Sequence, residues 1–377
     1  MWDSCQGAPS HAAEKNSGSY QLHRFVSGYR FSDTKSSSKS DAPLGAGCAR
    51  PAFATFQYLI HHQVMRIRMG KWPLVFAGIL LWVPLIHAQA DLIGDVRAQL
   101  AQNSFPAAES ELKNYKSQHG VTPEYLEALS WMARAAASTK QWDQAAAYAS
   151  ETRRLCEQQL TKRKLDSDPH LPIALGAAYE VLSQEMAEKG QHAQAVNLVR
   201  SALARYGNTS IRARLQKNLN LLALVGQPAP PLQVTQYLGP KPPTPAALKG
   251  SPVLLFFWAH WCVDCKAEVP IIARLQKEFA PAGLVVIGPT QLYGYAAQGA
   301  DASPEQERAY IESVRARYYA SLQDMPVPLS KQNFNAYGAS TTPTLVVLNR
   351  AGQVAMYHPG AISYDELRNA VQKAVAR

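Results

Sequence analysis

The stretch VLLFFWAHWCVDCKAEVP, residues 253–270, decides the fold of this 377-residue chain. Its first six residues are all apolar, which predicts a buried strand, and a helical pattern follows from 262 to 279. Cys262 is therefore expected at a helix N-terminus, where free N–H groups and the helix dipole lower a thiol pKa. Cys265 lies one turn later and is expected to be more buried. The pattern predicts that Cys262 attacks a disulfide as a thiolate and that Cys265 resolves the mixed disulfide.

Apolar strands and helices alternate downstream of this stretch. Strands are expected at residues 284–288, 344–348 and 354–358. Ser303 followed by Pro304 predicts the start of one helix, and a capping box from Ser363 to Glu366 predicts the start of the last. The order β-α-β-α-β-β-α predicts an α/β domain, with a mixed central sheet and helices on both faces. We assign residues 253–377 to this domain.

The segment before this domain is rich in proline. Residues 226–252 contain eight prolines, which indicates a linker, and one short strand is expected near residues 232–237.

Residues 91–225 have a different character, because helix-forming residues dominate them. Three similar segments open amphipathic helices at Phe105, Trp142 and His192, each three residues before an alanine. The run LGAAYEVL at 175–182 resembles the first helix of a tetratricopeptide repeat, so this region resembles degenerate repeats of that kind. Spacings of 37 and 50 residues depart from the usual 34, and an irregular helical bundle is the alternative. Cys156 is expected to be a small, buried apolar residue here.

The first 90 residues are interpreted as a leader. Residues 72–86 are apolar, basic residues precede them, and Ala88-Gln89-Ala90 follows, as in a secretory signal peptide over 65–90. We expect cleavage after Ala90; an uncleaved membrane anchor is the alternative. Residues 1–64 are interpreted as a mistranslated or disordered upstream extension.

This division changes the meaning of the net charge. The whole chain carries +10, of which residues 1–90 contribute +5 (9 basic minus 4 acidic) and the rest +5 (29 minus 24). Because half of the excess lies in the leader, the charge does not indicate a nucleic-acid partner.

The cysteine stretch and its flanks resemble a known family. FFWAHWCVDCKAEVP is similar to the active site of the extracytoplasmic thioredoxin-like TlpA/ResA-type disulfide reductases. The resemblance covers about residues 225–377. Three flanking segments share it: VGQPAP at 225–230, LKGSP at 248–252, and the run from Tyr337-Gly338 to Thr342-Pro343-Thr344.

The resemblance implies roles for four residues around the cysteines. Pro343 is expected to form a cis bond, and Thr342 and Pro343 are expected to contact an extended substrate. Trp261 is expected to shield the cysteines and contact the substrate. Glu268 is expected to be a partly buried carboxylate with a raised pKa that exchanges protons with a thiol, and a surface glutamate is the alternative.

Other residues near the site are less decisive. His260 either stabilises the thiolate as a cation or lies in solvent. Asp264 replaces a proline that is common in the family, which leaves the redox poise open. Four tyrosines either shape a substrate surface or pack helices: Tyr293, Tyr295, Tyr318 and Tyr319.

The resemblance also implies a function. It points to a periplasmic thiol-disulfide oxidoreductase, most simply a reductase of disulfides in secreted or apocytochrome c-type proteins. Its only redox centre would be the Cys262–Cys265 disulfide, with no metal and no other cofactor. A membrane thiol carrier would supply electrons, and the helical region would serve for partner docking or dimerisation.

Two other classes of function stay open. A copper carrier of the Sco type would use the cysteines with His358, although such proteins have three residues between their cysteines and this chain has two. A redox-inactive tetratricopeptide adaptor is the other, and the intact cysteine pair argues against it.

Overall fold

The structure is a computed structural model that describes residues 91–376. The expected upstream extension and signal peptide, residues 1–64 and 65–90, lie outside the described residues. Within 91–376, no helix combines the length and the apolar character that a membrane span requires.

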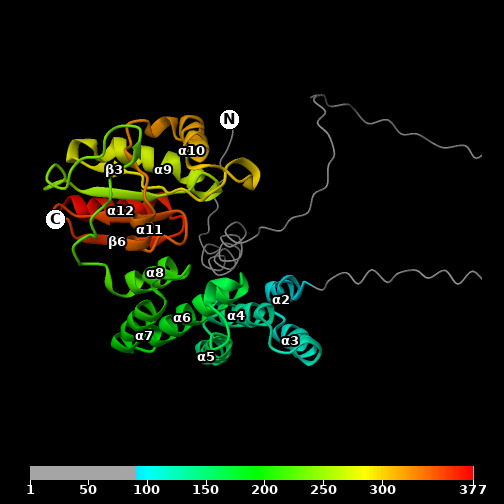
Figure 1. Ribbon diagram of the computed structural model, residues 1–377. Helices are drawn as coiled ribbons and strands as arrows, with labels where there is room; N and C mark the ends of the chain where they lie inside the picture. Colours follow the sequence, from blue (N-terminus) through cyan, green and yellow to red (C-terminus); the bar gives the residue numbers. More distant parts are fainter. Residues whose placement is uncertain (1–90, 377) are drawn as a thin grey trace, which may run out of the picture. The chain divides into compact units, whose positions relative to one another are not determined.

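Helices fill the first half of the described chain (Figure 1). The predicted helix starts at Phe105, Trp142 and His192 are confirmed, because α3, α5 and α7 begin there. The helices are α2 (Leu92–Ala101), α3 (Phe105–His119), α4 (Pro123–Ser138), α5 (Trp142–Gln159), α6 (His170–Glu188), α7 (His192–Tyr206) and α8 (Arg212–Ala223), with a short 3-10 turn at Leu165–Ser167. Their assignment to tetratricopeptide repeats stays a prediction.

Small side chains allow these helices to approach closely. Helices α4 and α5 pack against each other and both pack against α6. Ala133 and Ala136 of α4 meet Ala145 and Ala149 of α5 in one fully buried cluster. Alanine combines high helix propensity with a minimal side chain, so stacked helix pairs of this kind follow from the composition.

A buried charge network joins α6 to α8. Glu180 of α6 accepts hydrogen bonds from Nε of Arg214 and Nζ of Lys217, both at 3.0 Å and both on α8. Burial alone would raise the pKa of Glu180, but the charges of Lys217, Arg214 and Arg134 outweigh burial and lower it. The carboxylate is therefore ionised across the physiological pH range.

The second half contains a four-stranded mixed sheet in the order β3-β2-β5-β6. Strand β2 runs parallel to β3 and antiparallel to β5, and β6 is antiparallel to β5. The predicted mixed sheet is confirmed. The strands are β2 (Val253–Phe257), β3 (Val285–Ile287), β5 (Thr344–Leu348) and β6 (Val354–Pro359).

Both faces of this sheet are covered. Leu254 and Phe256 of β2 pack in one cluster with residues of α9 (Val263–Phe279), α10 (Pro304–Tyr318) and α12 (Tyr364–Val375). Leu255 and Phe257 point the other way, into a cluster with α11 (Lys331–Tyr337) and Leu224. Successive residues of a strand face opposite sides of the sheet. The all-apolar sequence of β2 therefore fits a strand that is buried on both faces.

Two details differ from expectation. The short strand expected near 232–237 is present but begins later in the chain: it is β1 (Tyr237–Leu238), which pairs with β4 (Val327–Pro328). The reason is that the backbone of Gln233 bonds to a side chain and not to a strand. Its N–H donates to Oδ1 of Asn333 at 2.7 Å, and its carbonyl oxygen accepts from Nδ2 of Asn333 at 2.9 Å. Helix α11 was not expected; Ser330 caps it by accepting from Gln332 N–H.

The expected caps of the flanking helices are present. Ser303 with Gln306 and Ser363 with Glu366 form reciprocal capping boxes that open α10 and α12. These bonds satisfy N–H groups that have no partner inside the helix, which fixes where each helix starts.

Candidate active site

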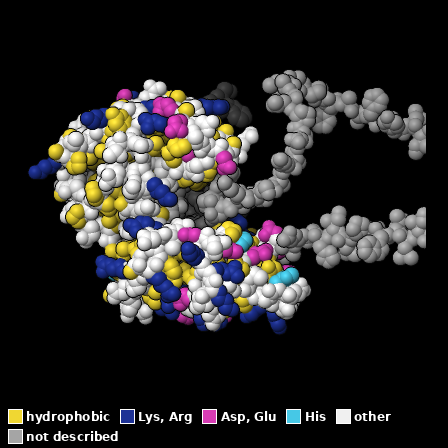
Figure 2. All heavy atoms as spheres, in the orientation of Figure 1, with side chains coloured by type: hydrophobic (Ala, Val, Ile, Leu, Met, Phe, Trp, Pro, Cys, Tyr) yellow, Lys and Arg dark blue, Asp and Glu magenta, His cyan; other side chains and the backbone are white. Residues whose placement is uncertain are grey.

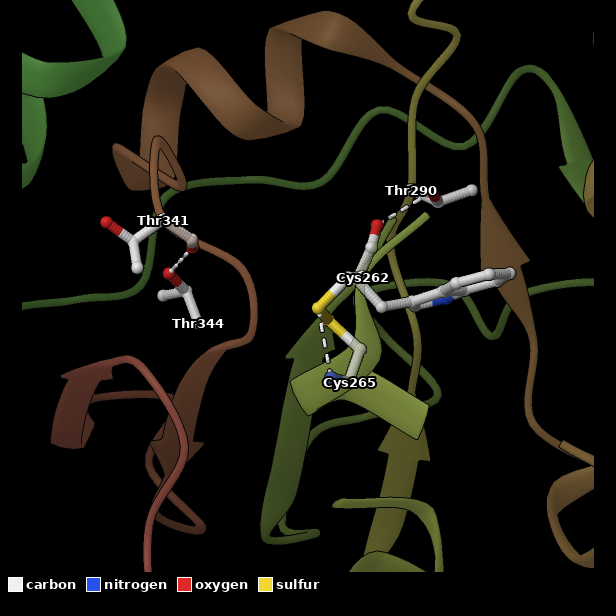
Figure 3. The surroundings of a disulfide bond; sticks show 6 residues. Cys262, Cys265, Thr290, Thr341 and Thr344 are labelled. Carbon is white, nitrogen blue, oxygen red and sulfur yellow. Dashed lines mark hydrogen bonds between the residues drawn. A yellow bond between two sulfur atoms is a disulfide. The ribbon is translucent and has the colours of Figure 1, made fainter. Parts of the chain in front are cut away.

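Cys262 and Cys265 form a disulfide at the start of α9 (Figure 3). Cys262 is the N-cap residue, and its Sγ accepts from the backbone N–H of Cys265 at 3.0 Å. Cys262 is 3% exposed and Cys265 is fully buried. After reduction, a thiolate at Cys262 would face the positive end of the helix dipole and a backbone donor, which both favour the charged sulfur.

Hydrogen bonds to the segment after β3 position the chain that leads into the cysteines. Thr290 donates its hydroxyl to the carbonyl oxygen of Trp258 at 2.8 Å (Figure 3), and the Trp258 backbone N–H donates to the carbonyl of Pro289. The Trp258 indole donates to the carbonyl of Gly288 at 2.9 Å. Trp258, the residue after β2, is thus held in place through both its backbone and its indole ring.

The turn before β5 faces the same site. The Thr342–Pro343 peptide bond is cis. The Thr344 hydroxyl donates to the Thr341 carbonyl at 2.6 Å (Figure 3), and the Pro343 carbonyl accepts from Gly360 N–H at 2.7 Å. Thr342 lines the same cavity as Cys262.

This cavity has a volume of about 1590 Å³. Trp261, Tyr293 and Phe334 give it apolar and aromatic lining beside Cys262, and residues 207–214, around the start of α8, also contribute to it. A cavity of this size holds more than a small dithiol, since sites for drug-sized ligands measure about 300–1,000 Å³.

Glu268 lies on α9, one turn after Cys265. Its side chain is 3% exposed, and Oε1 accepts from the backbone N–H of Ile362 at 2.8 Å. The alternative of a surface glutamate is therefore wrong. The carboxylate belongs to the buried layer between α9 and the segment that precedes α12.

Neither interpretation of His260 holds. Its side chain is 1% exposed, so it does not lie in solvent. Its Nε2 lies 3.2 Å from Oε1 of Glu307, a fully buried residue of α10. Burial lowers the pKa of His260 and outweighs the opposite effect of Glu307, which disfavours the cation expected to stabilise the thiolate. Glu307 carried no signal in the sequence, because it occurs among other charged residues of a helix.

The four tyrosines divide between packing and the cavity. Tyr319 is fully buried and lies 4.4 Å, centroid to centroid, from Trp258. Tyr318 is exposed, with the Lys266 ammonium over its ring. Tyr293 lines the cavity, and Tyr295 packs against His260.

Metal-ligating side chains are dispersed in the part of the chain that the structure describes. Within residues 91–376, three or more His, Cys, Asp or Glu residues do not converge on one point. Nε2 of His358 lies 3.3 Å from the carbonyl oxygen of Ala361.

Comparison with known proteins gives matches to thioredoxin-like proteins and thiol-disulfide oxidoreductases. The AhpC/TSA family model matches residues 225–291. The thioredoxin-like protein YneN of Bacillus subtilis is 31% identical over 144 residues, which are 38% of this chain and 75% of YneN. The thiol-disulfide oxidoreductase ResA of the same organism is 28% identical over 118 residues, 31% of this chain and 57% of ResA.

Two further matches are shorter or more distant. The thiol:disulfide interchange protein DsbE of Pseudomonas fluorescens is 35% identical over 65 residues, 17% of this chain and 34% of DsbE. A solved structure of a thioredoxin-family thiol:disulfide interchange protein from Chlorobium tepidum is 22% identical and covers 40% of this chain and 96% of its own, with a TM-score of 0.28.

Proposed function

Because the chain belongs to the thioredoxin-like family of thiol-disulfide oxidoreductases, we propose that it reduces disulfides in secreted or apocytochrome c-type proteins outside the cytoplasm. One observation carries this proposal: the Cys262–Cys265 disulfide lies at the N-terminus of α9, and Cys262 lines a cavity together with Thr342, next to the cis bond.

The reaction begins with the reduced protein. The Cys262 thiolate attacks one sulfur of a substrate disulfide, and the other substrate sulfur leaves as a thiolate that takes up a proton. Cys265, once deprotonated, then attacks Sγ of Cys262 and releases the second substrate thiol. Two electrons pass to the substrate, and the Cys262–Cys265 disulfide seen in the structure is the product state. A membrane thiol carrier would restore the dithiol.

Four neighbours of the cysteines take distinct parts in this proposal. Trp261 and Thr342 contribute to the cavity surface, and with Pro343 they would contact an extended substrate segment. Glu268, buried one turn after Cys265, would exchange a proton with a thiol. An unchanged pH profile of thiol exchange in Glu268→Gln would remove that role.

The attack step is tested by trapping. In Cys265→Ser the mixed disulfide at Cys262 lacks its resolving thiol, so substrate proteins should stay covalently attached and dissociate on addition of dithiothreitol. The matched control is the double variant Cys262→Ser, Cys265→Ser, which should trap nothing. Equal trapping by the two variants, or none by Cys265→Ser in the producing cells, would contradict the proposal.

The direction of the reaction is tested by the equilibrium potential of Cys262–Cys265 against a glutathione or dithiothreitol buffer. A reductase should have a potential of about −270 mV, whereas an oxidase would have a potential of about −120 mV. Asp264 stands between the cysteines in the first turn of α9. Since Asp264 is two residues after Cys262, whose sulfur becomes anionic, replacing this carboxylate by an uncharged residue should favour the thiolate.

The helical half would dock a partner or a second copy of the chain. Residues 207–214, around the start of α8, line the same cavity as Cys262, which supports docking of the substrate itself. The proposed location rests on the pattern over residues 65–90. Mass spectrometry of the mature protein checks it: the N-terminus should be Asp91, and a peptide that begins earlier would contradict cleavage.

A further inference from the structure

Three hydrogen-bond donors converge on the carboxylate of Glu307, which is fully buried on α10. The ring of His260 reaches Oε1 at 3.2 Å. The backbone N–H of Tyr293 donates to Oε1 at 2.6 Å, and that of Gly294 donates to Oε2 at 2.8 Å. Burying a carboxylate is costly unless its oxygens are hydrogen-bonded, and bonds to a charged acceptor are strong. These bonds therefore hold one defined arrangement of the segments that supply them.

The segments that meet at Glu307 come from three parts of the chain. His260 lies two residues before Cys262, in the loop that leads into α9, whereas Tyr293 and Gly294 follow β3. Glu307 belongs to α10. The Glu307 carboxylate thus links the cysteine loop to the segment that follows β3.

Tyr293 connects this buried pair to the substrate cavity. Its ring lies edge-on to both His260 and Trp261, with centroids 5.6 Å apart in each case. It lines the same cavity as Trp261 and Cys262. Tyr295 and Tyr310 also pack edge-on with the His260 ring, with centroids 5.4 and 5.3 Å from it.

We propose that Glu307 and His260 are positioning residues, which hold Tyr293 against Trp261 and thereby shape the wall of the cavity that receives a polypeptide substrate. This inference rests on the proposed exchange reaction at Cys262. The pair acts through Tyr293 and not on the sulfur atoms. A polypeptide segment fills the cavity and contacts its wall, whereas a small dithiol needs access to Sγ of Cys262 alone. The pair therefore affects recognition of proteins and spares reaction with small thiols.

The test compares Glu307→Ala, Glu307→Gln and His260→Gln in the full chain. Insulin is the protein substrate, and dithiothreitol is both the reductant and the small thiol. Glu307→Ala should raise KM for insulin by about tenfold and change kcat by less than about twofold, since the lost bonds order the wall and not the reacting sulfurs. The equilibrium potential against dithiothreitol should not change. The amides of Tyr293 and Gly294 should lose protection from hydrogen exchange.

The conservative variants distinguish positioning from general destabilisation. Glutamine at 307 retains one acceptor oxygen, and glutamine at 260 retains a donor, so both should restore KM at least in part. The matched control is Glu278→Gln: Glu278 of α9 also joins two helices, through Arg368 of α12 at 2.6 Å, but it does not line the cavity. This control should keep the wild-type KM.

The outcomes separate failure of the positioning role from failure of the proposed function. An unchanged KM in Glu307→Ala, with free exchange of the two amides, would overturn the inference, as would a shifted potential without a change in KM. If Glu307→Ala does not fold, Glu307→Gln and His260→Ala decide, each with an expected rise in KM of about threefold. A wild-type protein that does not reduce insulin at all would overturn the proposed function instead.

Discussion

At the scale of single residues, three described cysteines differ by environment. Cys262 caps a helix and lines a cavity, and Cys265 is buried behind it. Cys156 is fully buried in the core of the helical region and is a free thiol. The expectation that Cys156 is a small buried apolar residue is confirmed. A cysteine is therefore not reactive because of its residue type alone. Cys262 is expected to be reactive because it lies at a helix N-terminus and lines the cavity.

Cys156 allows a prediction about pH. Burial raises the pKa of its thiol from about 9 to about 12. The folded state therefore binds a proton that the unfolded chain releases above pH 9, so this contribution to stability is complete below pH 9 and is lost as pH rises toward 12. At pH 8 the native protein should not react with iodoacetamide at Cys156, whereas the unfolded protein should. Mass spectrometry checks this result, with reduced Cys262 as the reactive control. Rapid native alkylation of Cys156 would contradict it.

At the scale of elements, capping and buried charge set how helices start and where they meet. Capping boxes open α10 and α12 with bonds between residues three apart. The contact of α6 with α8 depends instead on Glu180, which neutralises Arg214 and Lys217 inside the helical core.

Glu180→Gln should strongly destabilise the protein. The change removes the buried carboxylate that pairs with Arg214 and Lys217, and breaking a buried ion pair typically costs about 3–5 kcal/mol. Urea unfolding measures the loss. The control is Glu151→Gln, because Glu151 pairs with Arg154 at the surface and its loss should cost less than about 1 kcal/mol. Equal effects of the two changes would show that the Glu180 network does not stabilise the fold.

At the scale of the whole molecule, α8 packs against both halves of the described chain. It contacts α6 and α7 on one side and α11 and β6 on the other. Leu224, just after α8, joins the cluster around Phe257 and Tyr337. On the surface, Figure 2 shows basic side chains interspersed with acidic and uncharged ones on the face drawn.

Gly338 is the position where this contact is closest. Its φ is +60°, and a Cβ there would overlap the backbone of Gln216 and Lys217 in α8. Gly338→Ala should therefore destabilise the protein by about 1–3 kcal/mol for the overlap, in addition to about 1–2 kcal/mol for the left-handed backbone. Gly352→Ala is the matched control, because φ is +75° there and the space is open. Thermal unfolding compares them; equal losses would mean that α8 does not pack tightly on α11.

The sequence by itself determined the local features of this protein. The similar segments and the apolar periodicity predicted the helix starts at Phe105, Trp142 and His192, and the position of Cys262 at a helix N-terminus. Both depend on residues a few positions apart, so a single sequence records them. The mixed sheet followed from the order of strands and helices and from the resemblance around residues 253–270.

The tertiary structure alone decided the contacts that complete the site. His260 pairs with Glu307 47 residues away, and Glu268 accepts from Ile362 94 residues away. Gln233, in the part of the expected strand that is a loop, is instead bonded to the side chain of Asn333, 100 residues later. The sequence distance between such partners follows no regular period or motif spacing. They are selected when packing brings buried polar groups together and each must find a hydrogen bond, which is a property of the folded chain and not of any segment of it.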